Sequence, residues 1–186
     1  NARVSFDVSV PWVKGLGFDG FFTYVNNSEI GKNFQKPWET FAFNKTTNAY
    51  TRVLGGGILA PQLTQSSARN KSTLINLRAK YENHFGGHHI NTFIAVEQSE
   101  GRSSNFSAFR RDFMSSSLDE LFAGSLTGMN ANGTAGESGR QNLFGRVGYG
   151  FKEKYLLDFN FRYDGSSNFP KDRRWGFFPG ASVAWR

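Results

Sequence analysis

Residues 142–164, NLFGRVGYGFKEKYLLDFNFRYD, alternate between apolar and polar side chains on both sides of a short charged turn. Leu143, Val147 and Tyr149 lie at alternate apolar positions before the turn, and residues 155–163 repeat the pattern after it. A period of two residues is typical of a β-strand with one apolar and one polar face. The apolar face carries no charge and has aromatic residues near both ends. The pair therefore predicts strands that lie between lipid and a polar lumen.

The bulk composition bounds the class of protein. The chain has 186 residues, no cysteine and a formal net charge of +7, and its mean hydropathy is −0.48. Disulfides and cysteine-based metal sites are excluded, and no apolar run is long enough for a transmembrane helix. A low hydropathy is compatible with a membrane barrel, because only alternate residues of its strands face lipid. Without a signal peptide, and with residues 1–10 already in a strand pattern, the chain is interpreted as a fragment.

The same alternation recurs along the chain and predicts about seven strands. Their connections are alternately short and long, and residues 26–71 and 99–139 are expected to be mostly loop. Within the second loop we expect a short helix over residues 117–122, capped by Ser116 or Ser117 and ended by Gly124. The predicted strands are 3–12, 18–25, 72–85, 89–99, 142–151, 155–164 and 175–185.

In an up-and-down meander, alternate connections emerge on the same side. All the short turns therefore lie on one side and the long loops on the other, as in outer-membrane barrels. We predict an all-β fold, an antiparallel up-and-down transmembrane β-barrel segment, with residues 1–186 forming one partial barrel domain. An open sheet leaves two edges unpaired, which lipid does not tolerate, so further strands are expected to complete it.

The strand phase assigns side chains to two faces. One uncharged face is expected to contact outer-membrane lipid, and the other is expected to line a polar interior. The lipid-facing residues are Val8, Phe22, Leu77, Ile94, Val147, Phe159 and Val183. The lumen-facing residues are Arg78, Lys80, Glu82, Arg146, Asp158, Asn160 and Arg162.

No motif in the chain indicates catalysis or a cofactor. Residues 15–20 match G-x-G-x-x-G, but a strand rather than a helix follows, so a hairpin explains them better than a dinucleotide site. His84, His88 and His89 cluster at a turn, yet no carboxylate or cysteine is spaced to complete a zinc site. The sequence therefore predicts no metal, no cofactor and no enzyme activity. Basic residues are scattered, which argues against a nucleic-acid surface.

Several phrases resemble a known family. RQNLFGRV at 140–147, RYDGSSNF at 162–169 and RWGFFP at 174–179 are similar to the barrel of SusC/RagA-type TonB-linked outer-membrane transporters. RDF at 111–113 and LDELFAG at 118–124 resemble the outer loop of that family. The resemblance implies a large barrel in the Gram-negative outer membrane, filled by an N-terminal plug and driven by TonB. It also implies a SusD-like surface lipoprotein over the mouth and an oligosaccharide or peptide cargo.

The two long excursions carry aromatic residues among polar ones and are expected to contact cargo or the lid. A soluble all-β carbohydrate-binding module, with Trp38, Phe41 and Phe43 as a stacking platform, is the alternative reading. A basic, aromatic nucleic-acid binder is a third, which salt-sensitive binding would favour. The candidate contact residues are Trp38, Phe41, Phe43, Phe106, Phe109, Arg110, Arg111 and Phe113.

Overall fold

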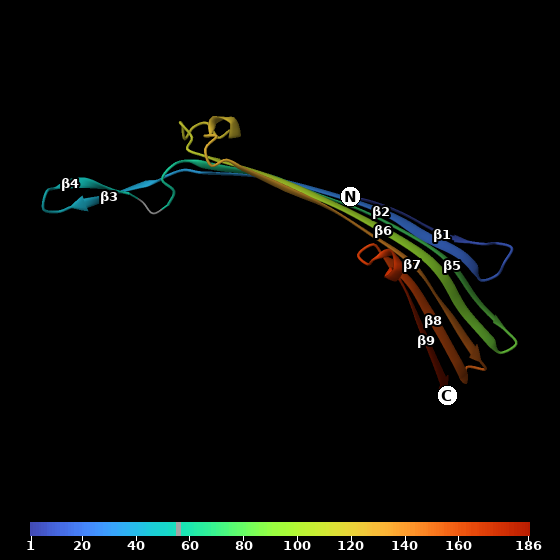
Figure 1. The fold of residues 1–186 in the computed structure, drawn as a ribbon. Helices are drawn as coiled ribbons and strands as arrows, with labels where there is room; N and C mark the ends of the chain where they lie inside the picture. The colour runs from blue at the N-terminus through green and yellow to red at the C-terminus, as the bar shows by residue number, and fades with distance from the viewer. Residues whose placement is uncertain (55–56) are drawn as a thin grey trace. The chain divides into compact units, whose positions relative to one another are not determined.

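The computed structural model describes residues 1–54 and 57–186, and β-strands dominate it (Figure 1). A seven-stranded sheet has the order β1-β2-β5-β6-β7-β8-β9, the order of an up-and-down meander, and β3 and β4 form a separate two-stranded sheet. The small sheet pairs β3 (Glu39–Asn44) with β4 (Ala49–Leu54). The large sheet contains β1 (Ala2–Ser9), β2 (Leu16–Gln35), β5 (Gln62–Phe85), β6 (His88–Arg111), β7 (Asn130–Phe151), β8 (Tyr155–Ser166) and β9 (Trp175–Trp185).

Three short turns lie at the same end of the strands (Figure 1). The turn from β5 to β6 consists of Gly86 and Gly87, whose positive φ angles of 53° and 82° suit a type I′ hairpin turn. The turn from β7 to β8 joins Phe151 to its cross-strand partner Tyr155. Short connections on one side of an antiparallel meander confirm the arrangement that the sequence predicts.

The chain divides into two compact units. The first contains residues 1–27, 70–103 and 136–186, and the second contains residues 28–69 and 104–135. The second unit corresponds to the excursions that we expected to be mostly loop, and this expectation is wrong. β2 continues to Gln35, β5 begins at Gln62, β6 continues to Arg111, and β7 begins at Asn130. Most side chains in these extensions are polar, and the few large apolar ones, such as Leu63 and Phe106, do not recur at alternate positions, so the sequence pattern does not reveal these strands.

The helix expected over residues 117–122 is also different. The structure has a 3-10 helix, η1 (Leu121–Ala123), whose N-cap is Glu120 without a side-chain cap bond. Capping by Ser116 or Ser117 is therefore wrong, whereas the end at Gly124 is confirmed. A second 3-10 turn, η2 (Lys171–Arg173), precedes β9. Within the described residues, no helix has the length and hydropathy needed to cross a bilayer.

The sheet has almost no protein core. Among the described residues, the buried apolar side chains are Leu63, Ala95 and Phe113. A soluble sandwich would bury one face of each sheet against another layer, and here the apolar face lies open. The residues that we expected to face lipid are all exposed: Val8, Phe22, Leu77, Ile94, Val147, Phe159 and Val183.

Candidate functional site

Charged side chains on the polar face of the first unit pair across neighbouring strands. Lys80 on β5 places Nζ 2.6 Å from Asp7 Oδ2 on β1 and 3.3 Å from Asp19 Oδ2 on β2. Arg78 donates from Nε to both carboxylate oxygens of Asp19, at 3.0 and 3.1 Å. Because Asp7 and Asp19 are direct cross-strand partners, the four side chains form one lattice over three strands. The lattice compensates each charge locally.

The lattice continues across the later strands. Glu97 on β6 accepts hydrogen bonds from Asn76 Nδ2 at 2.9 Å and from Asn142 Nδ2 at 3.2 Å, which links β5, β6 and β7. Arg146 on β7 donates from Nε to Asp158 Oδ2 on β8 at 2.6 Å. These side chains are partly exposed, so each ion pair stabilises the sheet by no more than about 1 kcal/mol.

The remaining residues that were expected to be lumen-facing lie on the same polar face. Arg162 pairs with Asp164 at 3.1 Å, and Asn160 lies directly opposite Arg146 in the β7–β8 register. Glu82 Oε1 lies 3.2 Å from His89 Nε2. The structure thus brings the expected set, Arg78, Lys80, Glu82, Arg146, Asp158, Asn160 and Arg162, onto one charged surface.

Sequence reasoning missed three phenylalanines on this polar face. Arg3 lies over the Phe21 ring at 4.0 Å, Arg78 over Phe93 at 5.7 Å and Arg162 over Phe144 at 5.3 Å. Cation–π contacts of this kind are attractive within about 6 Å of the ring centroid. The phase of the strands is the signal that could have found them, since Phe144 lies two residues from Arg146 and therefore on the same face.

Aromatic residues gather near both ends of the apolar face of β8. Tyr155 is the cross-strand partner of Trp185, and Tyr163 stacks on Trp175 with ring centroids 4.9 Å apart. Eight residues separate Tyr155 from Tyr163, or about 26 Å along a strand. Two aromatic groups with an apolar band between them are typical of strands that cross an outer membrane.

The β3–β4 hairpin of the second unit presents an aromatic face. Phe41 lies opposite Arg52 and Phe43 opposite Tyr50 in the register, so these side chains share one face. The rings of Phe43 and Tyr50 are 5.2 Å apart. Phe41, Phe43 and Tyr50 are exposed, as is Trp38 just before β3. Tyr50 was not among the expected contact residues, although its pairing with Phe43 places it on the same face as the expected aromatic residues.

Other expected contact residues hold the loop between β6 and β7. Phe113 is only 6% exposed and packs edge to face against Phe34, with ring centroids 5.1 Å apart. Arg110 donates from a terminal guanidinium nitrogen to the carbonyl oxygens of Phe122, at 3.4 Å, and Gly124, at 3.2 Å. Phe113 therefore packs the start of the loop against β2, and Arg110 hydrogen-bonds to the loop backbone.

The other expected contact residues of β6 are Phe106, Phe109 and Arg111. Phe106 is exposed, and Phe109 is half-buried. The exposed Arg111 places Nε 3.5 Å from Asp112. Phe106 is therefore the β6 residue with the most open aromatic surface.

A salt bridge ties the same loop to β2. Lys32 places Nζ 3.2 Å from Asp119 Oδ2 and 2.9 Å from Glu120 Oε1. The hydrogen bond to Glu120 is the main reason that the pKa of Lys32 lies above its ordinary value. In return, the hydrogen bond from Lys32 holds the pKa of Asp119 below its ordinary value.

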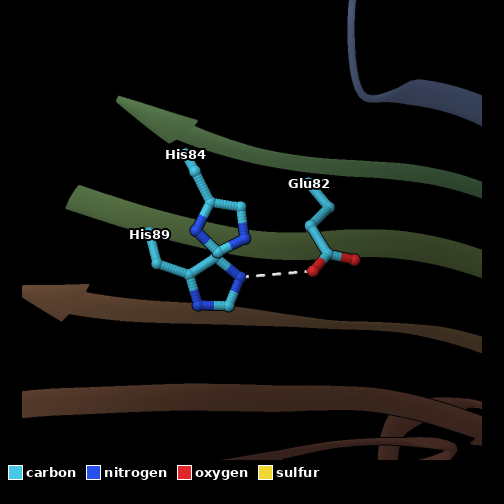
Figure 2. A group of neighbouring side chains, drawn as sticks. All are labelled: Glu82, His84 and His89. Carbon is cyan, nitrogen blue, oxygen red and sulfur yellow. Dashed lines mark hydrogen bonds and ion pairs between the residues drawn. The ribbon is translucent and has the colours of Figure 1, made fainter. Parts of the chain in front are cut away.

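The three histidines near the β5–β6 turn separate into two groups. Figure 2 shows His84 and His89 with their rings stacked and Glu82 beside them, and the ring centroids are 4.0 Å apart. His88 instead places Nδ1 2.7 Å from the hydroxyl oxygen of Tyr149. Glu82 supplies the carboxylate that sequence reasoning did not find: it lies two residues from His84 on β5, and the β5–β6 pairing brings His89 to both.

No family model matches the chain, but curated proteins resemble it in sequence. The chain is 27% identical over 186 residues to the TonB-dependent receptor P3 of Formosa agariphila. The match covers 98% of this chain and 17% of that receptor. The chain is also 49% identical over 45 residues to the TonB-dependent receptor SusC of Bacteroides thetaiotaomicron, a match that covers 24% of this chain and 4% of SusC. The chain thus spans less than a fifth of the curated relatives that it matches.

A solved structure shows the same fold. A chain of the RagAB peptide transporter superposes with a TM-score of 0.79 at 19% identity, over 97% of this chain and 19% of that one. The seven-stranded antiparallel sheet thus has the fold of one part of that transporter's barrel. The chain is therefore similar in sequence to TonB-dependent receptors and similar in fold to one part of the RagAB peptide transporter.

Proposed function

We propose that this chain forms part of the wall and outer mouth of a TonB-dependent transporter that imports oligosaccharides or peptides beneath a SusD-like lipoprotein lid. The uncovered apolar face carries this proposal, because an uncharged apolar surface of this kind suits contact with lipid. The same observation disfavours the soluble carbohydrate-binding module. Charges that pair within the sheet likewise disfavour a nucleic-acid surface.

We propose that the charged lattice lines the barrel interior. The pairing of β7 with β8 supports this proposal. Phe159 is paired with Val147 on the apolar face, whereas its neighbour Asn160 is paired with Arg146 on the polar face. A charge that faced lipid would be costly, and cross-strand pairing keeps the carboxylates and cations compensated in a weakly hydrated wall. We propose that coupling to TonB is carried out by a plug domain of the complete transporter.

The aromatic face of the β3–β4 hairpin is the proposed contact surface for cargo or lid. Phe41, Phe43 and Tyr50 offer flat apolar rings that suit the apolar faces of sugar rings or side chains of a peptide. Trp38 and Phe106 are equally open and belong to the same proposal. Arg110 and Phe113 are better suited to holding the β6–β7 loop, because Arg110 hydrogen-bonds to the loop backbone and Phe113 packs against Phe34 of β2.

The complete receptor carrying Phe41→Ala and Phe43→Ala together tests the contact surface. We expect normal insertion of the barrel, monitored by heat-modifiable migration, but reduced uptake or reduced co-purification of the lid. Thr40→Ala, whose side chain lies on the opposite face of β3, is the matched control and should leave both readouts unchanged. Normal uptake and normal lid association in the double variant would contradict a contact role for this face.

A further inference from the structure

Glu82, His84 and His89 form a cluster on the polar face beside the β5–β6 turn. Glu82 and His84 are two residues apart on β5 and therefore share a face, and His89 reaches the same place from β6 (Figure 2). One potential ligand atom from each residue lies within 4.8 Å of those of the others. Two imidazoles and a carboxylate are a recurrent ligand set for zinc.

The cluster needs only side-chain rotation to close on an ion. Ligand atoms around a tetrahedral zinc ion lie about 3.4 Å apart when the bonds are about 2.1 Å long. The imidazoles are stacked with an interplanar angle of 5°, so one ring must turn for both lone pairs to converge. Glu82 and His84 are exposed and His89 is partly exposed, so these rotations displace no packed neighbours.

The backbone around the cluster is already fixed. The amide nitrogen of Glu82 donates to the carbonyl oxygen of Gly15 at 2.9 Å, which holds β5 against the turn between β1 and β2. The carboxylate of Glu82 also lies 3.2 Å from His89 Nε2, so one ligand contact across the two strands exists without an ion.

We propose that Glu82, His84 and His89 bind a divalent first-row transition metal ion, with Zn²⁺ as the test ion, and that the ion fixes the β5–β6 hairpin. This departs from our expectation from sequence that the chain has no metal site. Imidazole nitrogens favour ions of this class over Mg²⁺ or Ca²⁺. The proposal does not depend on the transport function and would survive its failure.

His88 provides a matched control within the same turn. It is one residue from His89, so it lies on the opposite face of the strand, and its Nδ1 contacts the Tyr149 hydroxyl. A non-specific gain of zinc by any histidine near this turn would therefore depend on His88 as much as on His89.

Zinc binding to the complete, detergent-purified receptor tests the site. Chelator-stripped receptor is titrated with Zn²⁺ in competition with a chromophoric chelator, and His89→Gln, His84→Asn, Glu82→Gln and His88→Gln are compared with the unmodified protein. We expect each ligand variant to lose at least about 10- to 100-fold in affinity at one site, the loss that changing even an outer-shell partner causes. His88→Gln should bind like the unmodified receptor.

Two further readouts make the result unambiguous. Heat-modifiable migration reports that each variant is a folded barrel, so a loss of zinc in a folded variant belongs to the site. Zinc should also slow amide exchange in the β5–β6 turn of the unmodified receptor but not of His89→Gln. Equal zinc affinity in all folded variants, or equal loss in His88→Gln, would overturn the proposal.

Discussion

At the scale of single residues, Phe159 and Asn160 are neighbours in β8 that belong to opposite faces of the sheet. Phe159 is paired with Val147 and Ala181, and Asn160 with Arg146 and Gly180. Phe159 is also four residues from both Tyr155 and Tyr163, so it lies midway between the two aromatic groups. This position corresponds to the middle of the proposed bilayer contact.

Replacement of Phe159 by arginine therefore places a charge where the apolar face is expected to be deepest in lipid. We expect Phe159→Arg to lower the free energy of unfolding of the complete barrel by about 2–4 kcal/mol in lipid vesicles. Asn160→Arg introduces the same charge one residue away, on the polar face, and should cost less than about 1 kcal/mol. Equal losses in the two variants would refute the assignment of the faces.

At the scale of elements, the β6–β7 loop is held to β2 by the Lys32 salt bridge. The lowered pKa of Asp119 means that its contribution is fully present above its ordinary value, about 3.9, and is lost as pH falls through the lower folded-state value. The raised pKa of Lys32 gives its contribution to stability the opposite pH dependence. Its contribution is fully present below its ordinary value, about 10.4, and is lost as pH rises through the higher folded-state value.

We therefore expect the loop to be held most firmly between about pH 4 and pH 10. A fluorophore attached at residue 117 of the complete receptor should report increased loop motion below and above this range. Lys32→Met should remove the pH dependence, whereas Arg102→Met, which removes an unrelated pair with Glu137, should preserve it. A pH profile that Lys32→Met leaves unchanged would show that other groups hold the loop.

Sequence reasoning succeeded where one face of a strand is apolar and failed where neither face is. Alternation around Val147 and Phe159 predicts two paired strands, and the register confirms their pairing. The outer part of β5, from Gln62, is mostly polar, and its one large apolar residue, Leu63, is buried without a second apolar residue two positions away to reveal an alternating pattern. Cross-strand contacts such as Glu82 with His89 depend on register, which single-strand spacing does not reveal.

At the scale of the whole molecule, the seven-stranded sheet has β1 and β9 at its two edges. Lipid cannot satisfy the free hydrogen-bonding groups of an edge strand, so we propose that both edges pair with further strands in the complete barrel. In that barrel we propose that the charged lattice faces the interior. The sheet then contributes a charge-compensated surface to the proposed barrel.

The most direct measurement is the accessibility of single cysteines in the complete receptor in native outer membranes. Phe159→Cys and Val147→Cys should react with a lipid-phase probe, and Asn160→Cys and Arg162→Cys should not. The chain has no cysteine of its own, so this segment contributes no background. Reaction of Asn160→Cys with the lipid-phase probe, together with protection of Phe159→Cys, would contradict the wall that we propose.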